Sequence, residues 1–266
     1  MRGDPMRNFT LTIMAFIVCY GGMASAQTPE EIALPKKLTE IPKAVPTPII
    51  DGDLGDWPLL EMGAFISDEN RQGLDDCSAV IMMMWDEQNL YFAAKVYDDD
   101  LIQGKVGDQL WMEDDIQFDL DIDRMGDITN PIFNADDFQI GFSPGDFKRE
   151  KPEIYGWNPR GETPMNAPEN AKISSQKFKD GWTIEARIGL EDFNADLIGY
   201  AEFKEGMIFG FGRAINDYDT TGVGDGISSD GAWQDTSLMY ELELTGPFDV
   251  KSQMKIISYW GKVKNL

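Results

Sequence analysis

Apolar and polar residues alternate with a period of two in several segments of the chain. The alternation is clearest over residues 90–97, 116–122, 182–188 and 238–244. Successive side chains of a strand point to opposite faces, so this pattern predicts strands that each bury one face. Shorter apolar segments predict further strands over residues 80–85, 138–142 and 207–215.

One connection between these segments is short and polar. Residues 86–89 (Asp-Glu-Gln-Asn) separate two predicted strands and are typical of a hairpin turn. The sequence shows no long helical period, and only a short helical turn is expected near residues 191–196. Many short strands without intervening helices predict an all-β fold, an antiparallel β-sandwich of jelly-roll-like type.

The first residues have the pattern of an export signal. Arg2 and Arg7 precede a mostly apolar stretch over residues 9–20, and small residues at 24–26 (Ala-Ser-Ala) form a cleavage site. We therefore expect a signal peptide over residues 1–26 and a secreted, periplasmic or cell-surface protein.

The remaining chain divides by composition. Residues 27–48 are rich in Pro, Lys and Glu and are expected to form a linker or N-terminal arm. The folded domain is expected over residues 49–248, followed by a final strand or tail over residues 249–266.

Composition excludes several kinds of chemistry. The chain has no histidine, which excludes Ser-His-Asp and Cys-His catalysis and histidine-ligated metals. Signal cleavage would leave Cys77 as the single cysteine, so no intramolecular disulfide could form.

The formal charge of −24 becomes −25 when Arg2, Arg7 and Asp4 are removed together. Such a surface repels nucleic acid and anionic membranes, tolerates neutral ligands and attracts divalent cations. No segment after the signal predicts membrane insertion.

Residues 50–57 (Ile-Asp-Gly-Asp-Leu-Gly-Asp-Trp) are a first candidate for function. The two glycines permit tight turns, and the aspartates can close Asx turns or bind calcium. The structural interpretation is a turn whose Trp57 anchors the first strand in the core, and the pattern favours it.

Two further segments combine tryptophan with amides and carboxylates. Trp111 precedes a predicted strand whose polar face carries Gln117 and the alternate Asp residues. This pattern indicates either a solvated acidic face or an aromatic platform beside planar hydrogen-bonding groups. The strand that ends at Asn216 is followed by the Gly-rich residues 222–231 and by Trp233. This second pattern indicates either a turn with a packed tryptophan or a flexible loop that brings Trp233 to a polar cluster.

Residues 143–170 are rich in Pro, Gly and charge and are expected to form a long loop. Tyr155 and Trp157 lie within it, where they either pack against the domain or form a flap that touches a ligand.

These residue types suit a sugar ligand. A pyranose has apolar C–H faces, which pack on flat indole rings, and a rim of hydroxyl groups. Asn and Gln offer a donor and an acceptor side by side, matching hydroxyls that both donate and accept. Binding of this kind requires a rigid site and no activated nucleophile.

The order of the motifs resembles the family 9 carbohydrate-binding modules from about Ile49 to about Leu244. The matching segments are residues 50–57, 85–91, 114–117 with Trp111, 181–188, and 216–219 with Trp233. The resemblance implies a non-catalytic β-sandwich that clasps the terminal sugar of a poly- or oligosaccharide between Trp111 and Trp233. It places polar contacts at Gln117, Gln139 and Asn216, where the family pattern often has Glu at position 117 and Arg at position 139.

The resemblance also implies a role beside glycoside hydrolases in carbohydrate catabolism. It requires no cofactor, although structural calcium occurs in the family. Three alternatives stay open: a glycoside hydrolase with a carboxylate pair, a haem-binding sandwich with methionine ligands, and a calcium-dependent surface or assembly module without a sugar ligand.

Overall fold

The alternating segments fold as strands of one sheet. A computed structural model describes residues 40–57, 64–66, 76–158, 170–193, 199–219, 224–228 and 231–247, all within the compact unit Ala33–Leu266. The strands are β1 (Glu40–Lys43), β2 (Ala64–Ile66), β3 (Cys77–Trp85), β4 (Asn89–Asp98), β5 (Asp115–Asp121), β6 (Asp137–Ser143), β7 (Glu153–Asn158), β8 (Lys172–Phe178), β9 (Gly181–Gly189), β10 (Ile208–Tyr218), β11 (Gly224–Ser228) and β12 (Tyr240–Pro247).

The helical elements are short. They are η1 (Leu54–Asp56), η2 (Gly107–Met112), α2 (Arg124–Asp127), η4 (Leu190–Phe193) and η5 (Thr236–Leu238). In the described part of the chain, no helix is long and apolar enough to cross a membrane.

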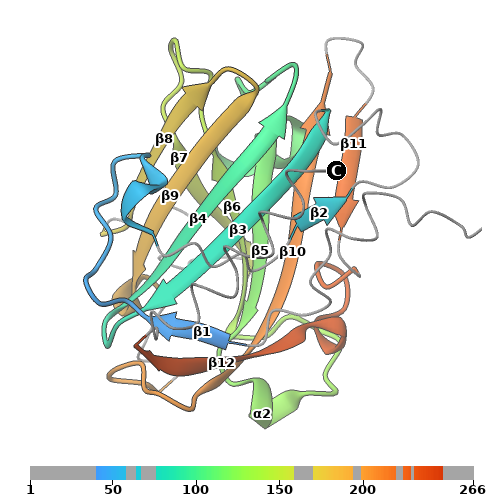
Figure 1. The fold of residues 1–266 in the computed structure, drawn as a ribbon. Coiled ribbons are helices and arrows are strands. Elements are labelled where there is room, and N and C mark those ends of the chain that lie inside the picture. The colour runs from blue at the N-terminus through green and yellow to red at the C-terminus, as the bar shows by residue number, and fades with distance from the viewer. Residues whose placement is uncertain are drawn as a thin grey trace, which may run out of the picture. The chain divides into compact units, whose positions relative to one another are not determined.

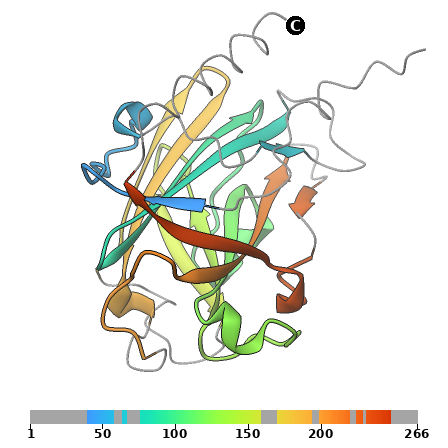
Figure 2. The ribbon, with the colours of Figure 1, turned by 60° about the horizontal axis from the view of Figure 1, so that its bottom comes forward.

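The described strands pair in one continuous order. The order is β7-β6-β5-β10-β12-β1-β3-β4-β9-β8, with β11 paired to β10 and β2 to β3. The pairs are antiparallel except that β1 runs parallel to both β12 and β3. Figure 1 shows β8, β9, β4 and β3 in a layer in front of β7, β6, β5 and β10. Strands β1 and β12 run side by side along the lower edge in Figure 1, which comes forward in Figure 2.

Aromatic side chains join the two layers across the core. The ring of Phe92 on β4 stacks on Phe118 of β5 with centroids 5.3 Å apart. Phe118 also packs against Phe142 on β6, at 5.1 Å, and against Phe211 on β10, at 5.3 Å. All four rings are fully buried, and each burial contributes roughly 1.5–3 kcal/mol to stability. This core fixes which face of β5 points away from it.

Several predictions about single elements are confirmed. The fold is all-β, β3 and β4 form a hairpin, and the amide of Asp86 donates to the carbonyl of Asn89 at 2.9 Å. The short helical turn is η4. The two layers belong to one hydrogen-bonded path, so the finer assignment to a sandwich or jelly roll stays a prediction.

Two loop predictions are corrected by the structure. Strand β1 lies inside the predicted linker, because Ile41 is fully buried and the backbone pairs with β12 and β3. Strand β7 lies inside the predicted loop 143–170, and it pairs with β6 while burying Ile154 and Gly156. Residues 1–39, 159–169 and 248–266 lie outside the described residues, so the expected signal peptide and C-terminal tail do too.

One predicted strand begins later than its pattern indicates. Leu238 was expected on the buried face of a strand over residues 238–244, but it lies in η5 and is 46% exposed. Asp235 accepts a hydrogen bond from the amide of Ser237 at 3.0 Å and so caps this turn. The strand therefore starts at Tyr240, and only Leu242 and Leu244 reach the core.

Trp57 is buried, as predicted, but in a second apolar cluster. It is 4% exposed and packs with Met82, Met84, Tyr91 and Ala93 on the outer face of β3 and β4. Its indole N–H donates to the carboxylate of Glu185 on β9.

Candidate functional site

The outer face of β5 is the starting point of the site. Ile116, Phe118 and Leu120 point into the core, so the alternating residues Asp115 and Gln117 point to the opposite face. The register places Gln117 opposite Gly141 on β6 and Ala214 on β10. Small neighbours on both sides leave room for polar side chains to meet there.

Five polar side chains from four strands form one network of hydrogen bonds, called here the amide network. Its members are Asp115, Gln117, Gln139, Asn158 and Asn216. Asn216 donates to Asp115 at 2.7 Å, and Gln117 donates to the same carboxylate at 3.3 and 3.4 Å. Gln139 donates to Gln117 at 3.3 Å, and Asn158 donates to Gln139 at 2.8 Å.

The structure therefore brings together the three polar residues expected from the sequence. Gln117 comes from β5, Gln139 from β6 and Asn216 from β10. Gln139 and Asn216 are half-buried, whereas Gln117 is almost fully buried. A contact between any of them and a sugar stays a prediction.

Two glycines allow other segments to pack closely on this face. A Cβ added to Gly141 on β6 would lie 2.3 Å from the ring of Trp157 and 3.1 Å from the Asp115 carboxylate. A Cβ added to Gly212 on β10 would lie 2.3 Å from the Cβ of Ala232. Trp157 thus covers β6 on one side of β5, and the segment that carries Trp233 covers β10 on the other side.

Trp111 is presented on η2, which is attached to β7. The indole N–H of Trp157 donates to the carbonyl of Asp108 at 3.0 Å, and the amide of Gly107 donates to the carboxylate of Glu153 at 3.2 Å. The Trp111 side chain is 48% exposed. An exposed indole on a fixed short helix is available to a ligand.

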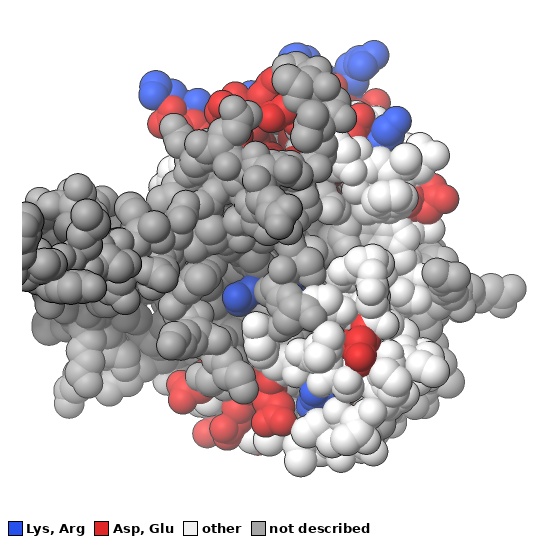
Figure 3. All heavy atoms as spheres, turned by 90° about the vertical axis from the view of Figure 1, so that its right-hand side faces the viewer, with Lys and Arg blue, Asp and Glu red and all other residues white. Residues whose placement is uncertain are grey.

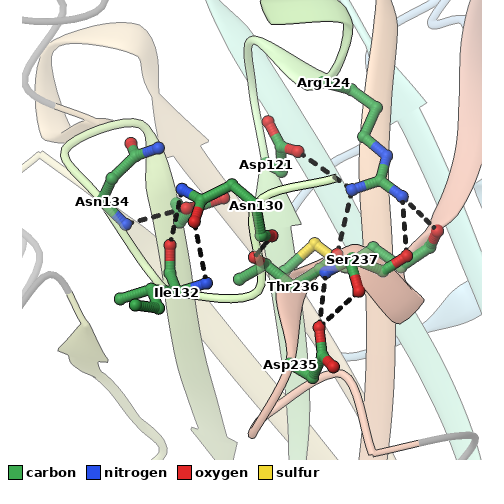
Figure 4. A network of polar contacts seen from close by, with 10 residues as sticks. Asp121, Arg124, Asn130, Ile132, Asn134, Asp235, Thr236 and Ser237 are labelled. Atoms are coloured by element: carbon green, nitrogen blue, oxygen red, sulfur yellow. Dashed lines mark hydrogen bonds and ion pairs between the residues drawn. The ribbon is translucent and has the colours of Figure 1, made fainter. Parts of the chain in front are cut away.

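Trp233 is 46% exposed, and the segment beside it is held by a buried arginine (Figure 4). Arg124 donates to the carbonyls of Thr236 at 2.9 Å, Ser237 at 3.2 Å and Met239 at 2.9 Å. Its guanidinium also pairs with Asp121 at 3.4 Å. This attachment fixes the residues that follow Trp233 to the end of β5.

The Gly-rich segment before Trp233 is not all loop. Residues 224–228 form β11, which pairs with β10 from Ala214 opposite Ser228 to Tyr218 opposite Gly224. Residues 220–223 and 229–230 lie outside the described residues.

Sequence reasoning missed two members of the amide network. Asp115 lies two positions before Gln117, so the alternation places it on the polar face with the other Asp residues, but the resemblance assigns only the amides to the site. Asn158 and Trp157, which packs on Gly141, belong to β7. The high content of Pro, Gly and charged residues in this segment predicted a loop in place of that strand.

Burial perturbs the carboxyl group at the centre of the network. Asp115 is fully buried, and this burial raises its pKa to about 7, while hydrogen bonds from Asn216 and Gln117 act in the opposite direction. Burial also raises the pKa of Glu185 and of Asp192.

These shifts predict that the protein is more stable in mild acid. Asp115, Glu185 and Asp192 hold a proton in the folded state at pH values where the unfolded chain has lost it. Their contribution to stability is complete below about pH 4 and is lost as pH rises through the folded pKa, which is about 7 for Asp115. We expect a higher Tm at pH 5.5 than at pH 8, measured by scanning calorimetry. A Tm that rises with pH over this range would contradict the assignment.

A separate group of carboxylates could hold a cation. Oxygens of Asp76, Asp99 and Asp219 lie within 4.8 Å of one another. Cys77 follows Asp76 in the chain, and burial raises the pKa of its thiol. Nearby carboxylates, including those of Asp217 and Asp98, raise this pKa further. Carboxylate oxygens are the ligands that calcium prefers, so the donor set fits this ion.

The other acidic turn is closed by its own hydrogen bonds. Asp51 accepts from the amide of Asp53 at 2.9 Å, and Asp53 accepts from Gly55 at 3.0 Å. This geometry agrees with the structural interpretation of residues 50–57.

Comparison with protein families identifies a relationship over most of the domain. The family model described as carbohydrate family 9 binding domain-like matches residues 50–247. An exoglucanase XynX of Acetivibrio thermocellus is 28% identical over 206 residues, and an endo-1,4-beta-xylanase A of Thermoanaerobacterium saccharolyticum is 26% identical over 207. Each alignment covers 75% of this chain and 16% of the relative, so the chain spans a small part of these enzymes.

Solved structures share the fold. A family 9 carbohydrate-binding module from Caldicellulosiruptor kristjanssonii in complex with cellotriose has a TM-score of 0.58 and 22% identity, covering 80% of this chain and 96% of that one. The module in complex with glucose has a TM-score of 0.55 and 22% identity, covering 79% and 98%.

Proposed function

Because the chain belongs to the carbohydrate family 9 binding domain-like family, we propose that it binds carbohydrate without altering it chemically. The observation that carries this proposal is the amide network, which lies between two segments that each expose a tryptophan. We also class the two facing layers as a β-sandwich, whose outer face holds the site.

The amide network suits the hydroxyl rim of a sugar. Gln139, Asn158 and Asn216 are half-buried, so their remaining N–H and carbonyl groups can meet a ligand while the strands hold them in place. Rigid amides lose little freedom on binding, which leaves more of the interaction energy for affinity. Trp111 and Trp233 supply apolar surface for the C–H faces of the ring.

The expected ligand is the terminal glucose unit of a poly- or oligosaccharide. Structural neighbours hold glucose and cellotriose, and the relatives are named as an exoglucanase and a xylanase. In Figure 3, carboxylates gather at the upper and lower margins of the face shown, and the described side chains between them are mostly uncharged, with single charged groups among them.

The alternative of a glycosidase requires two carboxyl groups that face a substrate. On the outer face of β5, Asp115 accepts from two amides and Asp121 pairs with buried Arg124. These carboxylates therefore have structural partners, which favours binding over hydrolysis.

Titration calorimetry tests the proposal directly. We expect saturable binding of glucose, cellobiose and cellotriose, with xylotriose as a second ligand series. Prolonged incubation should release no product above a heat-treated sample. The absence of heat with every member of a glycan panel would reject the sugar-binding function, whereas released reducing sugar would establish the glycosidase.

Calcium is proposed as a structural ion held by Asp76, Asp99 and Asp219, where it would offset their mutual repulsion. We expect a chelator to lower Tm and calcium to restore it, since an ion that binds only the folded state stabilises it. The substitution Asp99→Asn should remove this response. Asp53→Asn, in the other acidic turn, is the matched control and should retain it; the reverse result would place the ion in residues 50–57.

We also propose that the protein is exported, so that it meets polysaccharide outside the cytoplasm. The N-terminal charge and apolar pattern of residues 1–26 supports this location.

A further inference from the structure

Asp115 is the convergence point of the amide network and is itself fully buried. Asn216 donates to it from β10 and Gln117 donates to it along β5. Since Asp115 has no exposed surface, it cannot be a ligand contact in this conformation. Its effect on a ligand must pass through the two amides.

An ionised carboxylate fixes the direction of its neighbours. It can only accept hydrogen bonds, so Asn216 and Gln117 must both turn their NH₂ groups toward Asp115. The carbonyl of Gln117 then faces Gln139, which must donate, and the carbonyl of Gln139 faces Asn158, which must donate in turn. One buried charge thereby sets the orientation of four amides on four strands.

We propose that Asp115 is the positioning residue of the sugar site, where its carboxylate fixes which amide groups face the hydroxyls of the ligand. This inference rests on the proposed carbohydrate-binding function and adds the group that determines its hydrogen-bonding pattern. A neutral residue at position 115 can donate as well as accept, so the amides could reverse and lose their match to the sugar.

The same arrangement makes binding depend on pH. The charged and titratable side chains on the elements around Asp115 are Asp114 just before β5, Asp119 and Asp121 on β5, Arg213, Asp217 and Tyr218 on β10, Asp137 on β6, Glu153 and Tyr155 on β7, and Asp108 on η2. Asp114 accepts from the backbone amides of Ile102 and Tyr218, and Glu153 accepts from that of Gly107. The chain has no histidine, and burial raises the pKa of Asp115 to about 7. Burial also raises the pKa of Asp114 well above its usual range, so the Asp115→Asn variant, which keeps Asp114, identifies the carboxyl that causes a response near neutrality.

Calorimetry across pH tests the role. We expect affinity for cellobiose to be about fivefold greater at pH 8.5 than at pH 5.5, the effect of one hydrogen bond. Asp115→Asn should bind with the weaker affinity at both pH values. Tm of the unmodified protein should move in the opposite direction, being higher at pH 5.5, which separates lost binding from lost folding.

Side-chain amide signals in ¹H–¹⁵N NMR spectra test the network without a ligand. The NH₂ signals of Asn216 and Gln117 should shift together with pH in the unmodified protein and stay constant in Asp115→Asn. The matched control is Glu185→Gln, a buried carboxylate on β9 that accepts from Trp57 and the amide of Asp51. It should change stability while leaving affinity and its pH profile unaltered.

The outcomes separate the inference from the proposed function. The role of Asp115 alone would be overturned if Asp115→Asn bound the sugar as tightly as the unmodified protein at pH 8.5. It would also be overturned if the amide signals of the unmodified protein did not change with pH. If the unmodified protein binds no sugar at either pH, the proposed function fails, and the positioning role fails with it.

Discussion

Replacing Trp111 or Trp233 with alanine should weaken sugar binding about tenfold or more while the protein stays folded. A stacked indole is expected to contribute roughly 1 kcal/mol or more beyond the area that it buries, by analogy with aromatic pairs. Both side chains are nearly half exposed, at 48% and 46%, so their removal costs the core little. Titration calorimetry measures the affinity, and melting curves confirm folding.

The same segments supply matched controls for both substitutions. Met112 follows Trp111 on η2 and is 41% exposed, and Leu238 lies on η5 after Trp233 and is 46% exposed. Met112→Ala and Leu238→Ala remove comparable exposed apolar groups and should leave affinity unchanged. Equal losses in the controls would show a general effect of the segments, and unfolding of both tryptophan variants would mean that the indoles support the fold.

Sequence patterns predicted most strands because their buried faces follow the period of two. The alternation of Ile116, Phe118 and Leu120 with Gln117 identifies both faces of β5, and the structure agrees. The pattern does not show which strands pair with each other. The neighbours of β5 are β6, which follows it in the sequence, and β10, which lies about ninety positions later in the chain.

The site was predictable only in its parts. Gln117, Gln139 and Asn216 came from a resemblance, and their meeting depends on the register between β5, β6 and β10. Asn158 was not predicted because β7 is short, lies in a segment rich in Pro, Gly and charge, and has Gly156 at one of its two buried positions. Strand β1 was not predicted because Pro42 and the charged residues around Ile41 leave an apolar pattern too short to indicate a strand. Its extended conformation is stabilised by backbone pairing with β12 and β3.

Trp57→Ala should lower the free energy of unfolding by about 3–5 kcal/mol, the usual range for removing a large buried aromatic side chain. Trp57 fills the second apolar cluster with Met82, Met84 and Tyr91, and its N–H donates to buried Glu185. The substitution therefore opens a cavity and also removes a donor from a buried carboxylate. Denaturant unfolding curves give the change, and sugar affinity at temperatures where the variant is folded should be unaltered.

Trp57→Phe separates the two contributions. Phenylalanine retains much of the packing but cannot donate to Glu185, so its loss should be smaller, about 1–3 kcal/mol for a buried acceptor deprived of one partner. Glu185 would keep the amide of Asp51 as a donor at 3.0 Å. If Trp57→Ala instead abolished sugar binding without loss of stability, residues 50–57 would belong to the binding site, and the anchoring role of Trp57 would be wrong.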